Sequence, residues 1–479
     1  TQTDRHTGDF ALLRAYTSKD GSSKEFNKDN VPYKSNSFLK ISAKGVDEGD
    51  FVMVVGYPGR TNRLLTFNEI KYDLEIGFHE TVEFLKRGIE LIDKNTNDAD
   101  GSGLKYRGLK SGYENYFKKI SGQIDGAENF KLLISEESNW KSFLKFVEKE
   151  ASKNEKDYLD ALLNLVDEQQ KESLARSYYG NSVFISQAKR LYRNAVEKEK
   201  IDSERKPGYQ ERDQEKIMNR IKSLDYSFDL KVDKAIFTDR LSVYAKIEPS
   251  LRRPTYSKLL KLDSGLNEMN QAVDEIYSSQ YKDSESFLKM MEFSLDELND
   301  STDPLIVFAK KTYEESLEYE KKYEATGARR QLLKSKFIGL LKNYYESSNR
   351  QLYADANGTL RVTYGNVAGV SLEDGVRYEP FTRLEGIVQK HTNEEPFDAS
   401  DKLLKLINNK DYGKYFYEPI NSVPVNFLST LDITNGNSGS ATINSKFELV
   451  GLAFDGMLET IIADYKYIPQ ARTISVDSR

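Results

Sequence analysis

The sequence predicts an α+β multidomain protein in which a β-rich domain is interrupted by a large helical insertion. Two observations support this prediction. Glycine and short β-type runs concentrate at both ends of the 479-residue chain, and an apolar period of three to four residues fills the middle. Residues 1–65 hold six glycines and residues 351–479 hold ten, whereas the longer stretch 128–345 holds only five. One β domain with an inserted helical domain explains this pattern more economically than three independent units.

Residues 1–65 are expected to supply one part of the β domain, because apolar runs of strand length alternate there with turn clusters. The third run is rich in β-branched residues and is followed by Gly56-Tyr57-Pro58-Gly59, which predicts a buried strand closed by a turn. The three expected strands are Phe10–Tyr16, Phe38–Ile41 and Phe51–Val55.

Residues 66–350 are expected to form the inserted all-α domain. Apolar residues recur every three or four positions from Phe67 to Ile92, which gives one helical face, and Thr66 or Asn68 is placed to cap its start. The Lys- and Glu-rich runs of this region are interpreted as solvated helix surface rather than as a binding patch. Further helices are expected at 143–166, 182–199, 214–224 and 305–345.

Residues 351–479 return to short apolar runs and are expected to complete the β domain. A glycine- and serine-rich loop separates the second expected strand from the third, and a turn at 444–446 separates the third from the fourth. The four expected strands are 360–364, 423–428, 441–443 and 447–454.

Composition excludes several classes of function. With 70 basic and 76 acidic residues the net charge is −6, which argues against nucleic acid as the main partner. The absence of cysteine excludes a disulfide framework, a thiol nucleophile and cysteine-ligated metal. No run approaches the roughly 18 apolar residues that a membrane span needs. The three histidines, His6, His79 and His391, lie far apart and none has a second histidine at ligand spacing, so no metal is expected.

The motif Gly436-Asn437-Ser438-Gly439-Ser440 is the strongest chemical signal. Flanking glycines allow a tight turn that exposes Ser438 Oγ and aims the amides of Gly436 and Ser438 at one point. Such a pair of donors forms an oxyanion hole, worth about 3–4 kcal/mol per donor. Taken alone, the motif is also compatible with an ordinary hairpin loop. In this sequence the motif follows one expected strand and is followed by a strand, a turn and another strand. This order favours the interpretation of the motif as the nucleophile region of a trypsin-like double-barrel protease.

Four stretches together resemble the dipeptidyl-peptidase 7 and 11 family of bacterial serine exopeptidases. The resemblance covers both β segments, while the helical middle matches mainly in size and placement. It implies a chymotrypsin-like double β-barrel, with an incomplete first barrel, and an inserted helical domain that caps the cleft. The stretches are His6-Thr7-Gly8-Asp9-Phe10; Gly49-Asp50-Phe51 with Gly56 to Arg63; Val423 to Thr430; and Gly436 to Ser440 continuing to Phe454-Asp455-Gly456.

The resemblance also implies roles for individual residues. Ser438 matches the nucleophile, and Asp9 matches the triad aspartate that orients the imidazole. Asp455, and with a looser local match Asn115, match the groups that bind the substrate's free α-ammonium. Gly456 stands where acid-selective members carry arginine, so a hydrophobic or broad preference at P1, the residue before the scissile bond, is expected.

The same resemblance implies that the triad is incomplete in this chain. His6 belongs to the matched motif but is not the family's base, which lies upstream of it, and neither His79 nor His391 stands in a comparable motif. The chain begins without methionine or a signal peptide, so we expect a fragment or a processed form. Because its serine lacks a base, we expect this form to hydrolyse peptides poorly.

Three functional hypotheses remain open on the sequence. A serine dipeptidyl-peptidase is favoured, and the alternatives are a protease-fold binding protein that has lost catalysis and a trypsin-like endopeptidase. The family usually has glycine where Asn435 stands, proline where Ala441 stands and a tryptophan-rich lead-in before His6, so this is a divergent member. The resemblance further implies oligopeptide substrates, no cofactor, a homodimer, and a periplasmic or cell-surface location.

Overall fold

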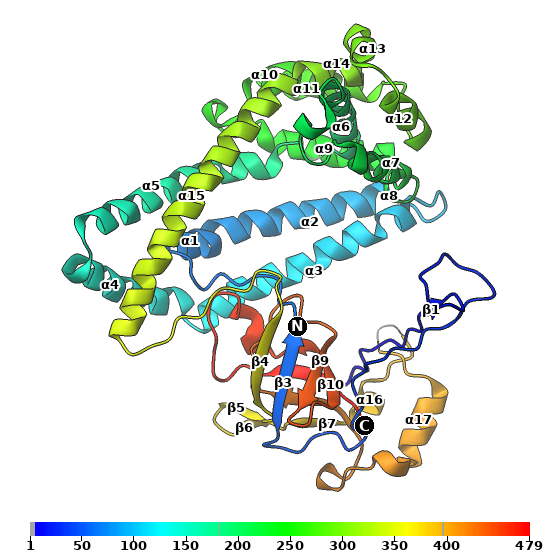
Figure 1. Ribbon diagram of the computed structural model, residues 1–479, viewed down its shortest axis with the longest axis vertical. Helices are drawn as coiled ribbons and strands as arrows, with labels where there is room; N and C mark the ends of the chain where they lie inside the picture. The colour runs from blue at the N-terminus through cyan, green and yellow to red at the C-terminus, as the bar shows by residue number, and fades with distance from the viewer. Residues whose placement is uncertain (1–4, 181, 395–396) are drawn as a thin grey trace. The chain divides into compact units, whose positions relative to one another are not determined.

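The computed structural model describes residues 5–180, 182–394 and 397–479 (Figure 1). The chain divides into two compact units. The first, here called the β unit, comprises the chain up to Leu65, Asp125–Leu132 and Tyr353–Arg479. The second, the helical unit, comprises Thr66–Ile124 and Leu133–Leu352. Helices together with antiparallel sheets confirm the predicted α+β class.

A seven-stranded antiparallel sheet forms the centre of the β unit, in the order β4-β3-β9-β10-β11-β8-β7. In Figure 1, β3 lies between β4 and β9, so the two ends of the chain share one sheet. A bridge between Val367 and Ser429 also brings the chain just after β4 to the end of β8. The strands are β3 (Phe51–Gly56), β4 (Arg361–Asn366), β7 (Phe381–Arg383), β8 (Pro424–Ser429), β9 (Ser440–Asn444), β10 (Leu449–Gly456) and β11 (Thr473–Asp477).

Strand burial explains which parts of this sheet the sequence could predict. In β3, Val52 and Val54 are fully buried in the core beside Phe427 and Val450, as the apolar run predicts. Every residue of β11 is also buried, although it alternates Thr, Ser and Asp with Ile and Val. Its hydroxyls are bonded inside the sheet, so a buried strand was possible without a continuous apolar run.

The structure corrects the expected strands near the start of the chain. Phe10–Tyr16 is wrong as a strand: only β1 (Tyr16–Thr17) pairs there, with β2 (Val31–Pro32), and Leu12 and Leu13 are 90% and 96% exposed. Phe38–Ile41 contributes a single parallel bridge from Ile41 to Leu449. A run can form a strand only where a neighbouring strand supplies its hydrogen-bond partners, and most of Phe10–Tyr16 pairs with no strand in the described ranges. The double β-barrel stays a prediction.

Smaller elements complete the β unit. A two-stranded sheet pairs β5 with β6, and η7 follows directly on β10. The last residues of α3 also belong to this unit, where Gly126 packs closely on Ile461 and Ile462. The elements are β5 (Val370–Glu373), β6 (Val376–Tyr378), α16 (Glu385–Lys390), α17 (Asp401–Asn408), η5 (Gly413–Tyr415), η6 (Glu418–Ile420) and η7 (Leu458–Ile462).

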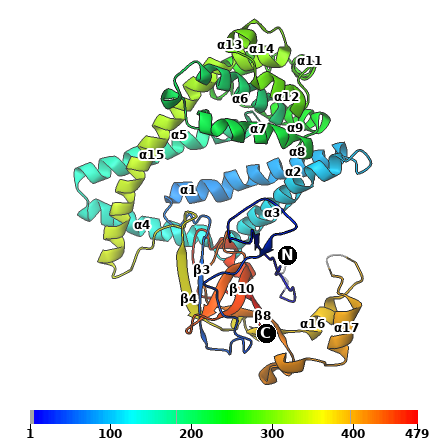
Figure 2. The ribbon, with the colours of Figure 1, turned by 45° about the vertical axis from the view of Figure 1, so that its right-hand side comes forward.

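The helical unit is built from helices of very different length. The longest, α15, packs against α5, as Figure 2 shows. The elements are α1 (Phe67–Tyr72), η1 (Asp73–Gly77), α2 (Phe78–Asn95), α3 (Ser102–Asn129), α4 (Leu132–Glu150), α5 (Lys153–Tyr178), α6 (Val183–Lys198), η2 (Asp202–Glu204), η3 (Glu211–Asp213), α7 (Gln214–Lys222), α8 (Leu224–Ser227), α9 (Leu230–Tyr244), η4 (Pro249–Leu251), α10 (Pro254–Leu259), α11 (Leu266–Tyr277), α12 (Ser284–Met291), α13 (Leu295–Asp300), α14 (Pro304–Lys311) and α15 (Tyr313–Ser347).

Caps explain where several of these helices begin. Thr66, rather than Asn68, caps α1: its hydroxyl accepts from the Glu69 amide, while the Glu69 carboxylate accepts from the Thr66 amide at 2.8 Å. The helix expected over 143–166 is in fact two, because Ser152 forms a second capping box and starts α5. The periodicity spans this break and could not locate it, since apolar spacing continues on both sides.

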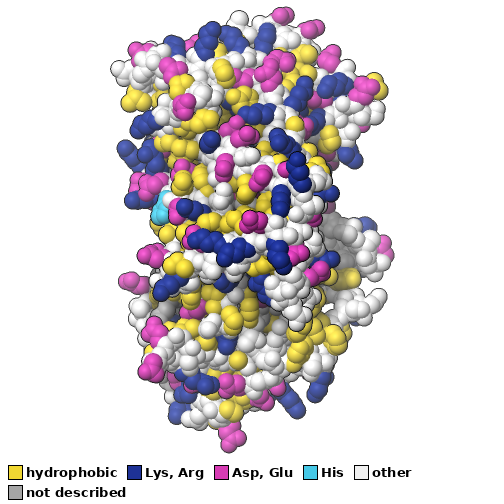
Figure 3. Space-filling view, turned by 90° about the vertical axis from the view of Figure 1, so that its left-hand side faces the viewer, with side chains coloured by type: hydrophobic (Ala, Val, Ile, Leu, Met, Phe, Trp, Pro, Cys, Tyr) yellow, Lys and Arg dark blue, Asp and Glu magenta, His cyan; other side chains and the backbone are white. Residues whose placement is uncertain are grey.

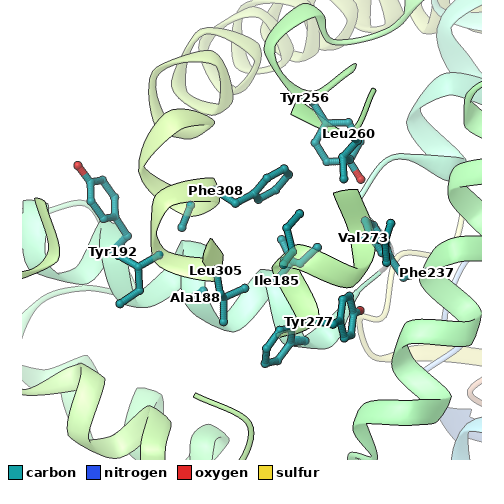
Figure 4. Packing of buried hydrophobic residues seen from close by; sticks show 14 of the residues in the cluster. Ile185, Ala188, Tyr192, Phe237, Tyr256, Leu260, Val273, Tyr277, Leu305 and Phe308 are labelled. Carbon is teal, nitrogen blue, oxygen red and sulfur yellow. The ribbon is translucent and has the colours of Figure 1, made fainter. Parts of the chain in front are cut away.

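The helical unit has its own apolar core, part of which is shown in Figure 4. Ile185, Ala188, Leu305 and Phe308 bring α6 and α14 into contact, and Tyr256 is buried beside them. Outside the core, acidic and basic side chains are interspersed over the face shown in Figure 3. None of the helices in the described ranges has the length and apolar character required to cross a membrane.

Candidate active site

The nucleophile loop, residues 432–439, connects β8 to β9 and holds Ser438 at the surface. Ser438 Oγ lies 3.3 Å from the main-chain oxygen of Phe454 on β10, to which it donates a hydrogen bond. Gly436 and Gly439 have φ values of +97° and +82°, a conformation that strains any residue with a Cβ. The loop is therefore a tight turn of the kind that the G-x-S-G spacing predicts.

Asn437 fixes this turn from inside. Its side chain is only 3% exposed, and its Oδ1 accepts a hydrogen bond from the Thr434 amide at 3.2 Å. Its own amide donates to the Thr434 carbonyl at 3.1 Å, and its carbonyl accepts from the Ser440 amide at 2.8 Å. These bonds close the loop on itself, so Ser438 lies on a bend that Asn437 holds in place.

The turn after β3 supports the nucleophile loop from the other side. The Gly59 amide donates to the Asn435 carbonyl at 2.6 Å, and a Cβ on Gly436 would lie 2.6 Å from the Tyr57 carbonyl. No residue in the described ranges accepts a hydrogen bond from the Gly436 or the Ser438 amide. Two unengaged amides that flank a serine are what an oxyanion hole requires.

Arg63 anchors the start of the nucleophile loop, a role that the sequence did not reveal. Its Nη1 and Nη2 donate to the two carboxylate oxygens of Asp432 at 2.6 and 2.8 Å, and Nη2 also donates to the Ala463 carbonyl at 2.7 Å. Burial opposes the charge, but the bonds and charge of Asp432 outweigh it and raise the pKa of Arg63. Thr434 donates from the same loop to Asp464.

Asp355 holds the segment that carries Arg63. Its carboxylate accepts from the Thr61 hydroxyl at 2.6 Å, from the Arg63 amide at 2.8 Å and from the Leu64 amide at 3.2 Å. Asp355 and Asp432 are far from Arg63 in the sequence, so no local spacing could have shown the network. The hydrogen bonds of Arg63, Asp355 and Asp432 therefore connect three segments: the nucleophile loop, the turn after β3 and the start of the C-terminal segment.

Asp455 is the residue after the carbonyl to which Ser438 is bonded. Its Oδ1 accepts from the Gly456 amide at 2.8 Å, and no cation in the described ranges pairs with it. Although Asp455 is exposed, partial desolvation of its carboxyl group raises the pKa of Asp455; the Gly456 bond opposes this shift and the charge of Asp9 adds to it. Asp9 therefore lies within electrostatic range of Asp455, and both are in the β unit with Ser438.

Gly456 and Asn115 are the other two residues expected at the site. A Cβ on Gly456 would collide with the Thr460 side chain in the middle of η7, so a larger residue there would require this segment to shift. Asn115 is exposed on α3 and belongs to the helical unit. The amine-binding role of Asn115 and the specificity role of Gly456 both stay predictions.

His6 and His391 make contacts of their own, whereas His79 is exposed. The His6 ring packs directly on Gly386, and His391 is held by Asn393 at 2.8 Å and by the Ala399 amide at 3.0 Å. His79 is exposed on α2 in the helical unit.

No histidine is hydrogen-bonded to Ser438 within the described ranges, and no cluster of three His, Asp or Glu side chains there could hold a metal ion. The expectation of a missing base stays a prediction.

Comparison with known proteins gives a consistent result. A protein-family model described as Peptidase S46 matches residues 4–479. The Asp/Glu-specific dipeptidyl-peptidase of Shewanella putrefaciens is 34% identical over 501 residues, which cover 99% of this chain and 68% of the relative. Dipeptidyl-peptidase 7 of Phocaeicola vulgatus is 29% identical over 493 residues, 99% of this chain and 66% of the relative.

Solved structures lead to the same group. The crystal structure of Porphyromonas endodontalis DPP11 in complex with the dipeptide Arg-Glu matches with a TM-score of 0.73 and 26% identity, over 99% of this chain and 68% of that one. The chain thus spans about two thirds of the length of the relatives it matches. The resemblance to the dipeptidyl-peptidase 7 and 11 family is confirmed.

Proposed function

The chain belongs to the peptidase S46 family, and from this premise we propose that it is a serine dipeptidyl-peptidase that releases dipeptides from the free N-terminus of oligopeptides. The arrangement of Ser438 carries the proposal. Its hydroxyl is exposed on a tight bend beside two unengaged amides, and it is bonded to the residue preceding an unpaired carboxylate, Asp455.

Each residue has a defined role in this mechanism. Ser438 Oγ attacks the carbonyl carbon of the substrate's second residue, and the amides of Gly436 and Ser438 stabilise the resulting oxyanion. Collapse of that intermediate releases the shortened peptide and leaves the dipeptide esterified to Ser438, until water hydrolyses the ester. Asp455 pairs with the substrate's α-ammonium and so fixes the distance from the N-terminus to the cleaved bond.

The proton of Ser438 needs a base, and Asp9 would orient an imidazole in that position. None of the three histidines is hydrogen-bonded to Ser438 in the described ranges, so we propose that the chain hydrolyses substrate slowly unless a base is supplied. Free imidazole added to the solution can take the place of the missing side chain, because it needs only to reach an exposed hydroxyl.

Hydrolysis of dipeptidyl nitroanilides tests the function. We expect slow release of nitroaniline that rises with imidazole concentration, disappears in Ser438→Ala and is absent when the substrate's amine is acetylated. Fast turnover without imidazole would contradict the missing base. Cleavage of the acetylated substrate would favour an endopeptidase. No Ser438-dependent hydrolysis even with imidazole would overturn the peptidase in favour of a binding protein.

For the P1 residue we propose a preference for Asp and Glu. Several relatives, including the one from Shewanella putrefaciens, are named Asp/Glu-specific dipeptidyl-peptidases. Gly456 supports the alternative of a hydrophobic or broad P1, because it offers no charge and Thr460 lies against it. Substrates that share P2 and differ only in Asp or Leu at P1 decide between them through kcat/KM. A periplasmic or cell-surface location and a homodimer remain proposals that follow from the family.

A further inference from the structure

A cavity of about 380 Å³ in the helical unit gathers cations that the peptidase mechanism does not use. Four of them line it: Lys189, Arg190 and Arg193 from α6, and Arg253 from the residue before α10. No Asp or Glu is among the described residues that line it. This cavity, here called the cationic pocket, lies wholly within the helical unit, so its description does not depend on the β unit.

Three of the four cations have no carboxylate partner within the described ranges. Arg193 is neutralised by Glu320 at 2.6 Å. Lys189, in contrast, donates to the Tyr179 hydroxyl at 2.9 Å, and the only side-chain bond described for Arg190 goes to the amide oxygen of a neighbouring glutamine at 3.3 Å. All four side chains are half-buried, so each has lost part of its hydration. Only Arg193 has gained a counter-charge in exchange.

Two tyrosine rings orient the guanidinium group of Arg253. Its guanidinium carbon lies 3.6 Å from the ring centre of Tyr179 and 4.3 Å from that of Tyr319. Stacking on two rings fixes the plane of the guanidinium while leaving its edge, which carries the N–H donors, without a described acceptor. A planar fork in this state suits bidentate binding of a carboxylate.

Two residues that line the cationic pocket also belong to the apolar core. Ile185 and Tyr256 line the pocket and belong to the core cluster of Figure 4, where Tyr256 lies near Phe308. Tyr256 is 1% exposed, so it closes this side of the pocket with the buried core rather than with a free polar group.

A second cavity of about 210 Å³ lies beside the first, with which it shares Tyr179 and Arg253. It adds Arg176, stacked on Tyr323 at 4.5 Å, and Glu172, which pairs with Lys322 at 2.6 Å. Two adjacent cavities with tyrosine walls fit an extended ligand better than a single small anion.

We propose that the cationic pocket binds the carboxylates of an acidic peptide. Arg190 and Arg253 are the main contacts, and the tyrosine rings hold the peptide between its acidic residues. The anion site follows from the pocket itself, whereas the choice of a peptide rests on the proposed function. Nucleic acid fits less well, because the basic side chains are confined to a cavity in a chain with net charge −6.

The test uses the whole chain carrying Ser438→Ala and an N-acetylated peptide rich in glutamate, so that neither catalysis nor the amine site contributes. Calorimetry should show binding that weakens at least tenfold in Arg190→Gln/Arg253→Gln. The matched control Lys222→Gln/Lys246→Gln removes the same charge from exposed positions of the same unit and should bind as the parent does. Thermal unfolding of both double variants checks that they are folded, and Arg253→Lys, which keeps the charge but loses the fork, should bind with intermediate affinity.

Several outcomes overturn the proposal. They are no binding, equal loss in the control variant, or equally tight binding of the glutamine version of the peptide. Displacement of the peptide by inorganic phosphate at equal concentration would assign the pocket to small anions instead. Because peptide binding is measured without hydrolysis, a failure here is distinct from failure of the nitroanilide assay, which tests the peptidase.

Discussion

Two acidic groups, one in each unit, are surrounded in opposite ways. Glu69 in the helical unit is 5% exposed, and although burial opposes its charge, Lys334, the Thr66 amide and Arg330 together outweigh burial and lower its pKa. Asp455 in the β unit is exposed and has no cationic partner among the described residues, and partial desolvation together with the charge of Asp9 raises its pKa. A carboxylate that stabilises the fold has its partners within the protein, whereas one left unpaired is available to a ligand.

The largest effect expected from this comparison is at Glu69. Glu69→Ala should destabilise the helical unit by about 3–5 kcal/mol, because it leaves Arg330 and Lys334 without their buried counter-charge and removes the carboxylate half of the capping box of α1. Urea denaturation followed by circular dichroism measures this loss. A change below about 1 kcal/mol, the range of surface pairs, would show that the ion pairs contribute no more than exposed ones.

Arg63 extends the comparison to the nucleophile loop, where a cation is again matched. Arg63→Ala should cost about 2 kcal/mol of stability and should lower kcat in the imidazole-supported assay more than it raises KM, because the loop loses its anchor at Asp432. Arg361→Ala is the control, because Arg361 is a partly exposed arginine at the start of β4. If both variants lower kcat equally, Arg63 has no special role in positioning Ser438.

Asp455 should behave as a ligand-binding carboxylate. In the Ser438→Ala background, Asp455→Asn should weaken binding of a peptide with a free N-terminus about tenfold to a hundredfold, the worth of one charge-assisted bond. The N-acetylated form of the peptide should bind both proteins alike. A loss that is equal for both peptides would remove Asp455 from the amine site.

The smallest effect is the pH dependence of stability, and its sign differs between the two groups. The contribution of Glu69 is present above its unfolded pKa and is lost as pH falls through its lowered folded pKa. For Asp455, whose folded pKa is raised, a penalty develops as pH rises from 3.8 and is complete above the folded pKa. Asp455→Asn should therefore unfold at a slightly higher temperature than the parent at pH 7 and at the same temperature at pH 3. The reverse order would contradict the unpaired state of Asp455.

The sequence was sufficient wherever the evidence is local. The turn at Ser438 follows from glycines at fixed offsets, and the helix beginning near Phe67 follows from apolar spacing and a capping threonine. Contacts across the chain could not be predicted this way. The pairing of β3 with β9 and the bond from Arg63 to Asp432 join residues hundreds of positions apart. The strand β11 was missed because its buried polar groups are satisfied only by tertiary partners.

The central claim is that Ser438 is a nucleophile whose substrate is held by its free N-terminus. Mass spectrometry after treatment with a dipeptidyl phosphonate ester, in the presence of imidazole, tests it most directly. We predict a covalent adduct on the peptide containing Ser438, formed with the free-amine reagent and not with its acetylated form. Absence of the adduct at Ser438, or equal labelling by both reagents, would contradict the account.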